Sequence, residues 1–167
     1  MISAAVVLLA AQVGWCKKKT EEEAAPTGEL VDVFDDQASV ENVTKITSEI
    51  LSAYPDIAGI SGFDGASPGI GAAIKESGRA GDIKVTAQDV DPPQVKHLED
   101  GVFHVLVGQK RKLFSYYSAK LLYDYIHSPI DITANDEGAG ISNIPQRVDT
   151  GLFLVTSENV KAFKGEE

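Results

Sequence analysis

From residue 30 onward, short apolar runs alternate with segments of helical spacing. The predicted strands are residues 30–34, 57–61, 83–87, 104–108 and 148–155. Between them, apolar residues recur every three to four positions, which predicts helices over residues 40–54, 68–77, 92–101 and 112–127, with a short closing element at 157–163. Alternating strands and helices indicate βαβ units with right-handed crossovers. We therefore predict an α/β fold, a single doubly wound (Rossmann-like) lobe with a parallel sheet.

Capping residues support the predicted helix starts. Ser39 precedes the first helix, and Ser67 and Asp91 each precede a proline at the first helical position. The next long segment, residues 128–147, has no sustained period and contains two prolines and two glycines. A long irregular connection in a compact domain is uncommon. We interpret it as a crossover segment that has a function or lacks a partner.

The N-terminal residues differ from the rest of the chain in their pattern of apolar and charged positions. Residues 2–11 are nearly all apolar, Cys16 follows, and residues 17–29 are charged with a proline and a glycine. This pattern is typical of an export signal, a lipid-attachment cysteine and a solvated tether. We therefore predict a lipoprotein-like signal segment over residues 1–16, a tether over 17–29 and a ligand-binding lobe over 30–163. The alternative is a frayed N-terminus with a chance cysteine at position 16.

Composition limits the classes of partner that we expect this chain to bind. The chain has 167 residues, enough for one domain, and a formal net charge of −10. Basic residues cluster only in two short runs, so we expect no nucleic-acid partner. One cysteine excludes an intramolecular disulfide. No apolar run reaches the ~20 residues that span a bilayer, so membrane contact is expected only through a lipid on Cys16.

A polar side chain that can bind a ligand follows each of three successive predicted strands. Asp64, Asp89 and Gln109 come at the ends of strands 57–61, 83–87 and 104–108. Parallel strands that feed crossover helices end at the same edge of the sheet, where such folds bind ligands. Ionised carboxylates accept hydrogen bonds and an amide both donates and accepts them. The pattern predicts a site for a polyhydroxylated small molecule, with Phe63 in the same glycine-rich turn as Asp64.

Other chemistry is not indicated. The pair Asp89 and Asp91 resembles the DxD of aspartate-nucleophile phosphatases, but two prolines follow it and Asp91 is better placed as a helix cap. The three histidines are scattered, and no spacing suggests a metal. No glycine-rich phosphate loop matches a nucleotide-binding motif. We predict no catalytic residue, no metal and no cofactor, and hence no enzyme.

Five segments carry a resemblance to a known family. They are VDVFDDQAS, ILSAYPDIAGI, AAIKESGRAGDIKV, KHLEDGVFHVLVGQK and VDTGLFLVTSENV. In this order they resemble the ribose-type sugar-binding proteins of bacterial ABC importers, from about residue 29 to residue 160. Those proteins have two α/β lobes that close on a ligand, and only the C-terminal lobe of the type I periplasmic-binding-protein fold is recognisable here. The segment that matches residues 128–146 crosses back to the first lobe in the family.

The resemblance implies a function and a set of site residues. It implies carbohydrate binding as the substrate-binding component of an ABC importer, truncated to one lobe, at the periplasm or the outer face of the cell membrane. The implied ligand-binding residues are Asp64, Asp89, Gln109 and Phe63, with Phe34, Asp35 and Asp36 as weaker candidates. Implied partners are a small sugar, the permease components, and a homodimeric copy or a complementing lobe.

Three alternatives stay open. The effector-sensing core of a LacI-type regulator has the same fold, although such a regulator carries a basic helix-turn-helix at its N-terminus. A phosphatase-like enzyme on a doubly wound scaffold would use Asp89. A gene remnant without an independent role is the third.

Overall fold

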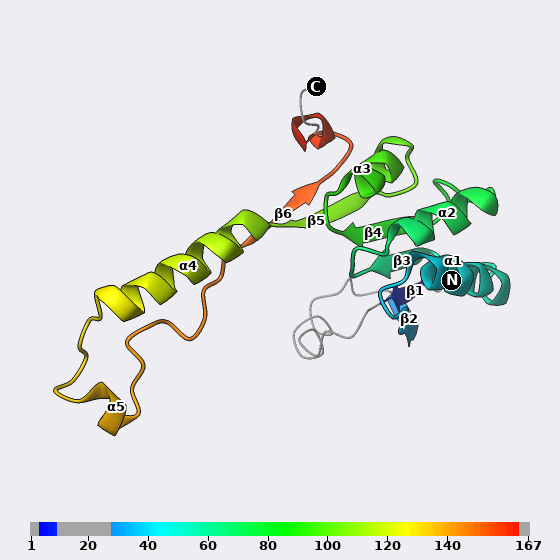
Figure 1. The fold of residues 1–167 in the computed structure, drawn as a ribbon. Helices are drawn as coiled ribbons and strands as arrows, with labels where there is room; N and C mark the ends of the chain where they lie inside the picture. The colour runs from blue at the N-terminus through cyan, green and yellow to red at the C-terminus, as the bar shows by residue number, and fades with distance from the viewer. Residues whose placement is uncertain (1–3, 10–27, 164–167) are drawn as a thin grey trace. The chain divides into compact units, whose positions relative to one another are not determined.

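A six-stranded sheet forms the centre of the fold. The computed structural model describes residues 4–9 and 28–163, with side chains from residue 30 (Figure 1). The strands are β1 (Ala4–Leu9), β2 (Gly28–Phe34), β3 (Gly59–Gly62), β4 (Lys84–Gln88), β5 (Val105–Gln109) and β6 (Leu152–Val155). The helices are α1 (Val40–Ala53), α2 (Pro68–Glu76), α3 (Pro92–Glu99), α4 (Arg111–His127) and α5 (Asp136–Ala139), and a 3-10 helix, η1, spans Val160–Phe163.

The strand order explains where the described helices lie. The order is β2-β1-β3-β4-β5-β6, and the pairs among the first five strands are parallel. The connections through α1, α2 and α3 all advance in the same direction, so right-handed crossovers place these helices on one face of the sheet. Only the connection from β1 to β2 runs the other way, as in a doubly wound sheet. The predicted fold class is confirmed.

One face of the sheet carries the core. Along β4, Val85 and Ala87 are buried while Lys84 and Thr86 are exposed. The buried face packs against helix side chains that repeat at helical spacing. The fully buried core side chains are Val43, Ile50, Ile60, Ile70, Ile74, Ile83, Val85, Phe103 and Leu106. Burial of this apolar surface is the main driving force for folding.

Close packing between α1 and α2 depends on glycine. A Cβ on Gly69 would lie 2.5 Å from the Val40 carbonyl oxygen and 2.9 Å from Thr44 Oγ1. No side chain fits there, so α2 can approach the backbone of α1 only with glycine at this position. Ser39 caps α1 as expected, because its side chain accepts a hydrogen bond from the Asn42 amide at 3.3 Å. These local features set the position of the turn that precedes α2.

Part of the N-terminal apolar run forms a strand of the sheet. Ala4–Leu9, expected to belong to an export signal, forms β1 and pairs with both β2 and β3. β2 also begins at Gly28, inside the expected tether. A short apolar run is compatible with a signal core or with a buried parallel strand, and periodicity cannot separate the two. Cys16 lies outside the described residues.

The chain divides into two compact units. The first unit comprises Met1–Gly108 with Leu154–Glu167, and the second unit comprises Gln109–Phe153. The boundaries of the expected ligand-binding lobe, residues 30–163, stay a prediction. Within the second unit the chain follows α4 and continues through α5, whose cap Asn135 accepts a hydrogen bond from the Gly138 amide at 3.0 Å (Figure 1). Apart from α5, residues 128–147 are irregular, as predicted.

Helix α4 differs from its prediction in its surroundings. Apolar residues that recur at helical spacing predict this helix, yet no residue of α4 is buried. Leu113 and Leu121 are half-buried, and Tyr117 and Tyr125 are exposed. No helix in the described part of the chain is long and apolar enough to cross a bilayer.

Candidate functional site

The candidate site lies at the carboxyl edge of the sheet, next to the point where the strand order reverses. β1 separates β2 from β3, and the chain leaves β2 and β3 toward α1 and α2 at the same edge. In open α/β sheets the crevice at such a switch point is where ligands bind. Asp36 follows β2, Asp64 follows β3 and Asp89 follows β4. Three strand ends at this edge thus each supply a carboxylate.

The turn after β3 is built around glycine and Asp64. A Cβ on Gly62 would lie 2.8 Å from both Ile70 Cδ1 and Ser67 Cβ, so the turn can pack on α2 only without a side chain here. Asp64 Oδ1 accepts a hydrogen bond from the Ala66 amide at 2.9 Å, and the Asp64 carbonyl accepts one from the Ser67 amide at 3.3 Å. One carboxylate oxygen of Asp64 is therefore committed to shaping the turn.

The second oxygen of Asp64 is buried, and the charge of this side chain is affected by its neighbours. Oδ2 is buried and has no donor among the described residues. Burial raises the pKa of Asp64, and the negative charges of Asp36 and Asp89 raise it further, while the Ala66 amide opposes the rise. Burial and neighbouring negative charge therefore both disfavour the ionised form of Asp64.

Asp36 is the most buried member of this group. Its exposed fraction is 1%, and its Oδ1 accepts a hydrogen bond from the Ala38 amide at 2.9 Å. Gln37 and Ala38 both have positive φ, 55° and 54°. Such values are unfavourable for residues with a Cβ, so this turn after β2 is strained. Sequence reasoning placed Asp36 only among the weaker candidates, whereas in the structure its charge raises the pKa of Asp64.

Asp89 also occupies a strained position. Its φ is 73°, in the left-handed region that favours glycine, and its amide donates to the Val107 carbonyl at 3.0 Å. This backbone bond to β5 holds the residue in place directly after β4. Strained residues that persist at a sheet edge are candidates for function. The side chain is half-buried.

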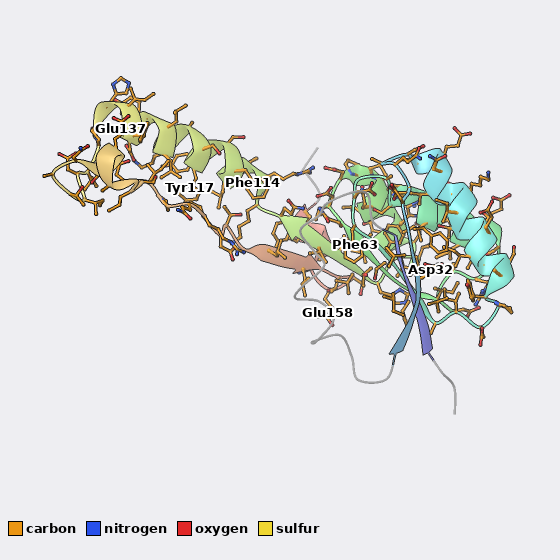
Figure 2. All side chains as sticks on the ribbon, turned by 90° about the horizontal axis from the view of Figure 1, so that it is seen from below. Asp32, Phe63, Phe114, Tyr117, Glu137 and Glu158 are labelled. Atoms are coloured by element: carbon orange, nitrogen blue, oxygen red, sulfur yellow. The ribbon has the colours of Figure 1, made fainter. Side chains whose placement is uncertain are left out.

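The remaining predicted site residues lie near the same strand ends. Phe63 is half-buried and follows β3 directly (Figure 2). Gln109 is the last residue of β5, which pairs in parallel with β4, and it is the first residue of the second unit. Asp91 occupies the N-cap position of α3, as expected. The charges of Asp36 and Asp89 thus both raise the pKa of Asp64. The part played by Gln109 and Phe63 stays a prediction.

Sequence reasoning missed Gln94. This side chain is 1% exposed, and its Nε2 donates to the Gly65 carbonyl at 3.4 Å, which ties α3 to the turn of Asp64. Nothing in the apolar pattern distinguishes it from a surface glutamine of a helix. Buried Oε1 of Gln94 and Oγ of Ser67 have no partner among the described atoms. The Gln94 side chain, together with the close packing at Gly62, thus positions the turn of Asp64.

The side chains at this edge can form hydrogen bonds with a ligand. No group of three or more His, Cys, Asp or Glu side chains within the described ranges could hold a metal ion. Carboxylates can accept several hydrogen bonds. Such a group suits a ligand with several hydroxyls in a fixed arrangement.

Comparison with solved structures places this arrangement in context. A sugar ABC transporter sugar-binding protein from Bacillus halodurans superposes with a TM-score of 0.83 at 24% identity, over 97% of this chain and 58% of that one. An arabinose-binding protein from Geobacillus stearothermophilus gives 0.80 at 20% identity, over 98% and 57%. A carbohydrate-transporter solute-binding protein from Agrobacterium radiobacter, in complex with D-arabinose, gives 0.73 at 22% identity, over 96% and 55%.

This chain therefore spans less than three-fifths of these proteins. At such identities the likeness establishes the fold. No curated protein matches the sequence. The sequence itself matches the family described as periplasmic binding protein domain over residues 9–128, which is well over half of its length. This match extends through the turns that hold Asp36, Asp64 and Asp89, and by it the chain belongs to the periplasmic binding protein domain family.

Proposed function

We propose that this chain binds a neutral pentose or hexose as part of the substrate-binding component of a bacterial ABC importer. Three structural relatives support the ligand class, since they are an arabinose-binding protein and solute-binding proteins in complex with D-arabinose and D-allose. Because the chain spans only 54% to 58% of these and the Bacillus halodurans chain, it corresponds to a part of such a protein. Its contribution is one lobe of the binding site.

The observation that carries this proposal is the convergence of three carboxylates at the switch point of the sheet. Asp64 and Asp89 would accept hydrogen bonds from sugar hydroxyls, and the Gln109 amide would donate and accept. The ring of Phe63 would pack against the C–H face of the sugar. Asp36 would act through Asp64, since its negative charge raises the pKa of that side chain. No step of covalent chemistry is needed, in keeping with a family of binding proteins.

The proposal also covers location and partners. Members of this family are periplasmic binding proteins, and we propose that this chain works outside the cytoplasm and delivers its sugar to permease components. A lipid on Cys16 stays a prediction. The pairing of β1 weighs against cleavage before Cys16, because cleavage there would remove Ala4–Leu9 from the sheet. The mass of the mature protein isolated from the membrane fraction tests this point.

Calorimetric titration with D-arabinose, D-ribose, D-allose and D-glucose tests the binding function. We expect heat with at least one sugar and a loss of affinity of at least tenfold in Asp89→Asn, because a charge-assisted hydrogen bond contributes about 1.5–3 kcal/mol. The matched control is Asp82→Asn, which changes the same charge at the opposite end of β4. It should bind like the wild type.

Two results would contradict the proposal. Absence of heat with every sugar would remove the binding function, and equal affinities in Asp89→Asn and Asp82→Asn would remove the site. The predicted alternative, a phosphatase-like enzyme, is checked with a phosphate ester and magnesium. Turnover that disappears in Asp89→Asn would favour the enzyme over the binding protein.

A further inference from the structure

The sequence contains two Asp-Gly pairs, and the structure holds them in different ways. Asp64 and Gly65 lie in the turn after β3, whereas Asp100 and Gly101 follow α3. In an Asp-Gly pair the side-chain carboxyl can react with the next backbone nitrogen, because glycine has no Cβ to obstruct the approach. This reaction needs a free nitrogen and a protonated carboxyl. The surroundings of each pair therefore decide whether it occurs.

The backbone nitrogen is available in the first pair and occupied in the second. The Gly65 amide donates no hydrogen bond within the described part of the chain, and only the carbonyl of this residue is engaged, by Gln94 Nε2 at 3.4 Å. The space around Gly65 is open, since a Cβ placed there would meet no atom within 4 Å. The Gly101 amide instead donates to the Leu98 carbonyl at 3.1 Å. Attack by the Gly101 nitrogen would first have to break this bond.

The carboxyl group of Asp64 is arranged for attack at its carbon atom. Oδ1 accepts a hydrogen bond from the Ala66 amide at 2.9 Å, and this donor would stabilise the negative charge that collects on Oδ1 when nitrogen bonds to Cγ. Oδ2 is buried and has no donor among the described residues, so it is the oxygen that takes the proton and can depart. Burial and the charges of Asp36 and Asp89 raise the pKa of Asp64, which favours this protonated form.

The carboxyl group of Asp100 is held in the ionised, unreactive form. Its two oxygens accept hydrogen bonds from Lys75 and Lys96. These bonds lower the pKa of Asp100 to about 2. A carboxylate has no hydroxyl to lose, and its negative charge repels an incoming nitrogen lone pair. At pH 5 the protonated form of Asp64 is therefore at least about tenfold more abundant than that of Asp100.

We propose that Asp64 and Gly65 form a site of spontaneous isomerisation to isoaspartate, from which the pair Asp100 and Gly101 is protected. The Gly65 nitrogen bonds to Asp64 Cγ, and Oδ2 leaves as water with its own proton and the amide proton. The product is a five-membered succinimide. Water then adds to one of the two succinimide carbonyls and breaks its bond to nitrogen. Addition at the former backbone carbonyl leaves the chain linked through Cγ, with no net change in mass.

The modification would remove a carboxylate from the candidate sugar site. In isoaspartate the backbone runs through Cγ and is one carbon longer, and the free carboxylate is the former backbone carboxyl of residue 64. The bond between Oδ1 and the Ala66 amide, which shapes the turn, is then lost. This consequence for sugar binding rests on the proposed function, whereas the isomerisation itself does not.

Storage of the folded, full-length chain at pH 5 tests the proposal. Samples taken over several weeks are digested, and the isoaspartate at each site is measured by chromatography and electron-transfer dissociation mass spectrometry, which gives fragments diagnostic of isoaspartate. We expect isoaspartate at residue 64 to accumulate at least about tenfold faster than at residue 100, in line with the protonated fractions. The reaction at residue 64 should be slower at pH 8 than at pH 5, because less of the Asp64 carboxyl is then protonated.

Two controls separate the effect of the fold from that of the local sequence. In the chain unfolded by guanidinium chloride, the two pairs should isomerise at similar rates, because both then have free amides and ordinary carboxyls. Gly65→Ala has open space around its Cβ, so it should keep the turn and suppress isoaspartate at residue 64. A folded chain in which residue 64 reacts no faster than residue 100 would overturn the proposal. So would isoaspartate at residue 64 that forms equally fast in Gly65→Ala.

Titration of the stored chain with the sugar that binds the fresh chain separates the modification from the proposed function. The fraction of molecules that bind should fall in proportion to the isoaspartate at residue 64, and stored Gly65→Ala should keep its binding. Isoaspartate at residue 64 with undiminished sugar binding would support the modification and contradict the role of Asp64 in the sugar site. Undiminished binding without isoaspartate would overturn the modification and leave the sugar site intact.

Discussion

Replacing Asp89 by glycine should stabilise the fold and abolish the function, a combination that a merely structural residue would not give. The φ of 73° at this position is open to glycine and costs about 1–2 kcal/mol for a residue with a Cβ, of which aspartate recovers a part through local hydrogen bonds. Glycine should therefore raise the free energy of unfolding by about 0.5–1 kcal/mol. The backbone bond from residue 89 to Val107 is kept.

The comparison with alanine makes this prediction specific. Asp89→Ala keeps the Cβ and loses the polar side chain, so it should lower the stability by up to about 1 kcal/mol. At about 2–4 °C per kcal/mol for a chain of this size, the two variants should melt on opposite sides of the wild type. Both remove the same carboxylate. Sugar affinity should therefore fall by roughly 10- to 150-fold in each, one charge-assisted hydrogen bond being lost.

Thermal unfolding followed by circular dichroism gives the stabilities, and calorimetry with the sugar that binds the wild type gives the affinities. Equal melting temperatures for the glycine and alanine variants would refute the argument from backbone strain. Wild-type affinity in the glycine variant would refute a role for the Asp89 side chain in the site. Either result is independent of the other.

Three further predictions concern the stability of the first unit. Burial raises the pKa of Asp64, so the ionised form of this side chain destabilises the fold above that pKa. Asp64→Asn should therefore raise Tm at pH 7, and this gain should vanish at pH 3. An equal gain at both pH values would contradict the prediction. Hydrogen bonds from two lysines lower the pKa of Asp100 to about 2, so the stability lost in Asp100→Asn should be measurable at pH 7 and disappear as the pH falls from about 4 toward 2. Gly71→Ala places a Cβ 2.5 Å from the His97 ring, so it should lower the free energy of unfolding, measured by chemical denaturation, by about 1–3 kcal/mol. Gly65→Ala has open space around its Cβ, so it should lose no stability through overpacking.

The alternation of strands and helices could be predicted from the sequence because it depends on local pattern. Apolar spacing, Ser39 at a helix start and proline after Ser67 and Asp91 specify elements within a few residues of themselves. The edge that holds Asp64 and Asp89 followed from the same pattern, since parallel strands that feed crossover helices end together. The parallel sheet confirms the reasoning about the strands, and the role of the two carboxylates stays a prediction.

Other features were decided by contacts between distant segments. The apolar run that contains Ala4–Leu9 has the composition of an export signal and of a buried strand, and its hydrogen bonds to β2 and β3 make it a strand. Gln94 and Asp36 joined the site because folding buries them beside the turn of Asp64, which no spacing in the sequence reveals.

What the sequence by itself determined is the order of elements and the edge at which the polar residues emerge. Only the tertiary structure decided which of those residues are buried beside one another and which apolar residues lie in a core. Helix α4 has the sequence of a buried helix and lies exposed, because burial requires a second surface that local pattern cannot provide. Secondary structure is set by near neighbours along the chain, whereas burial and pKa are set by whatever folding brings into contact.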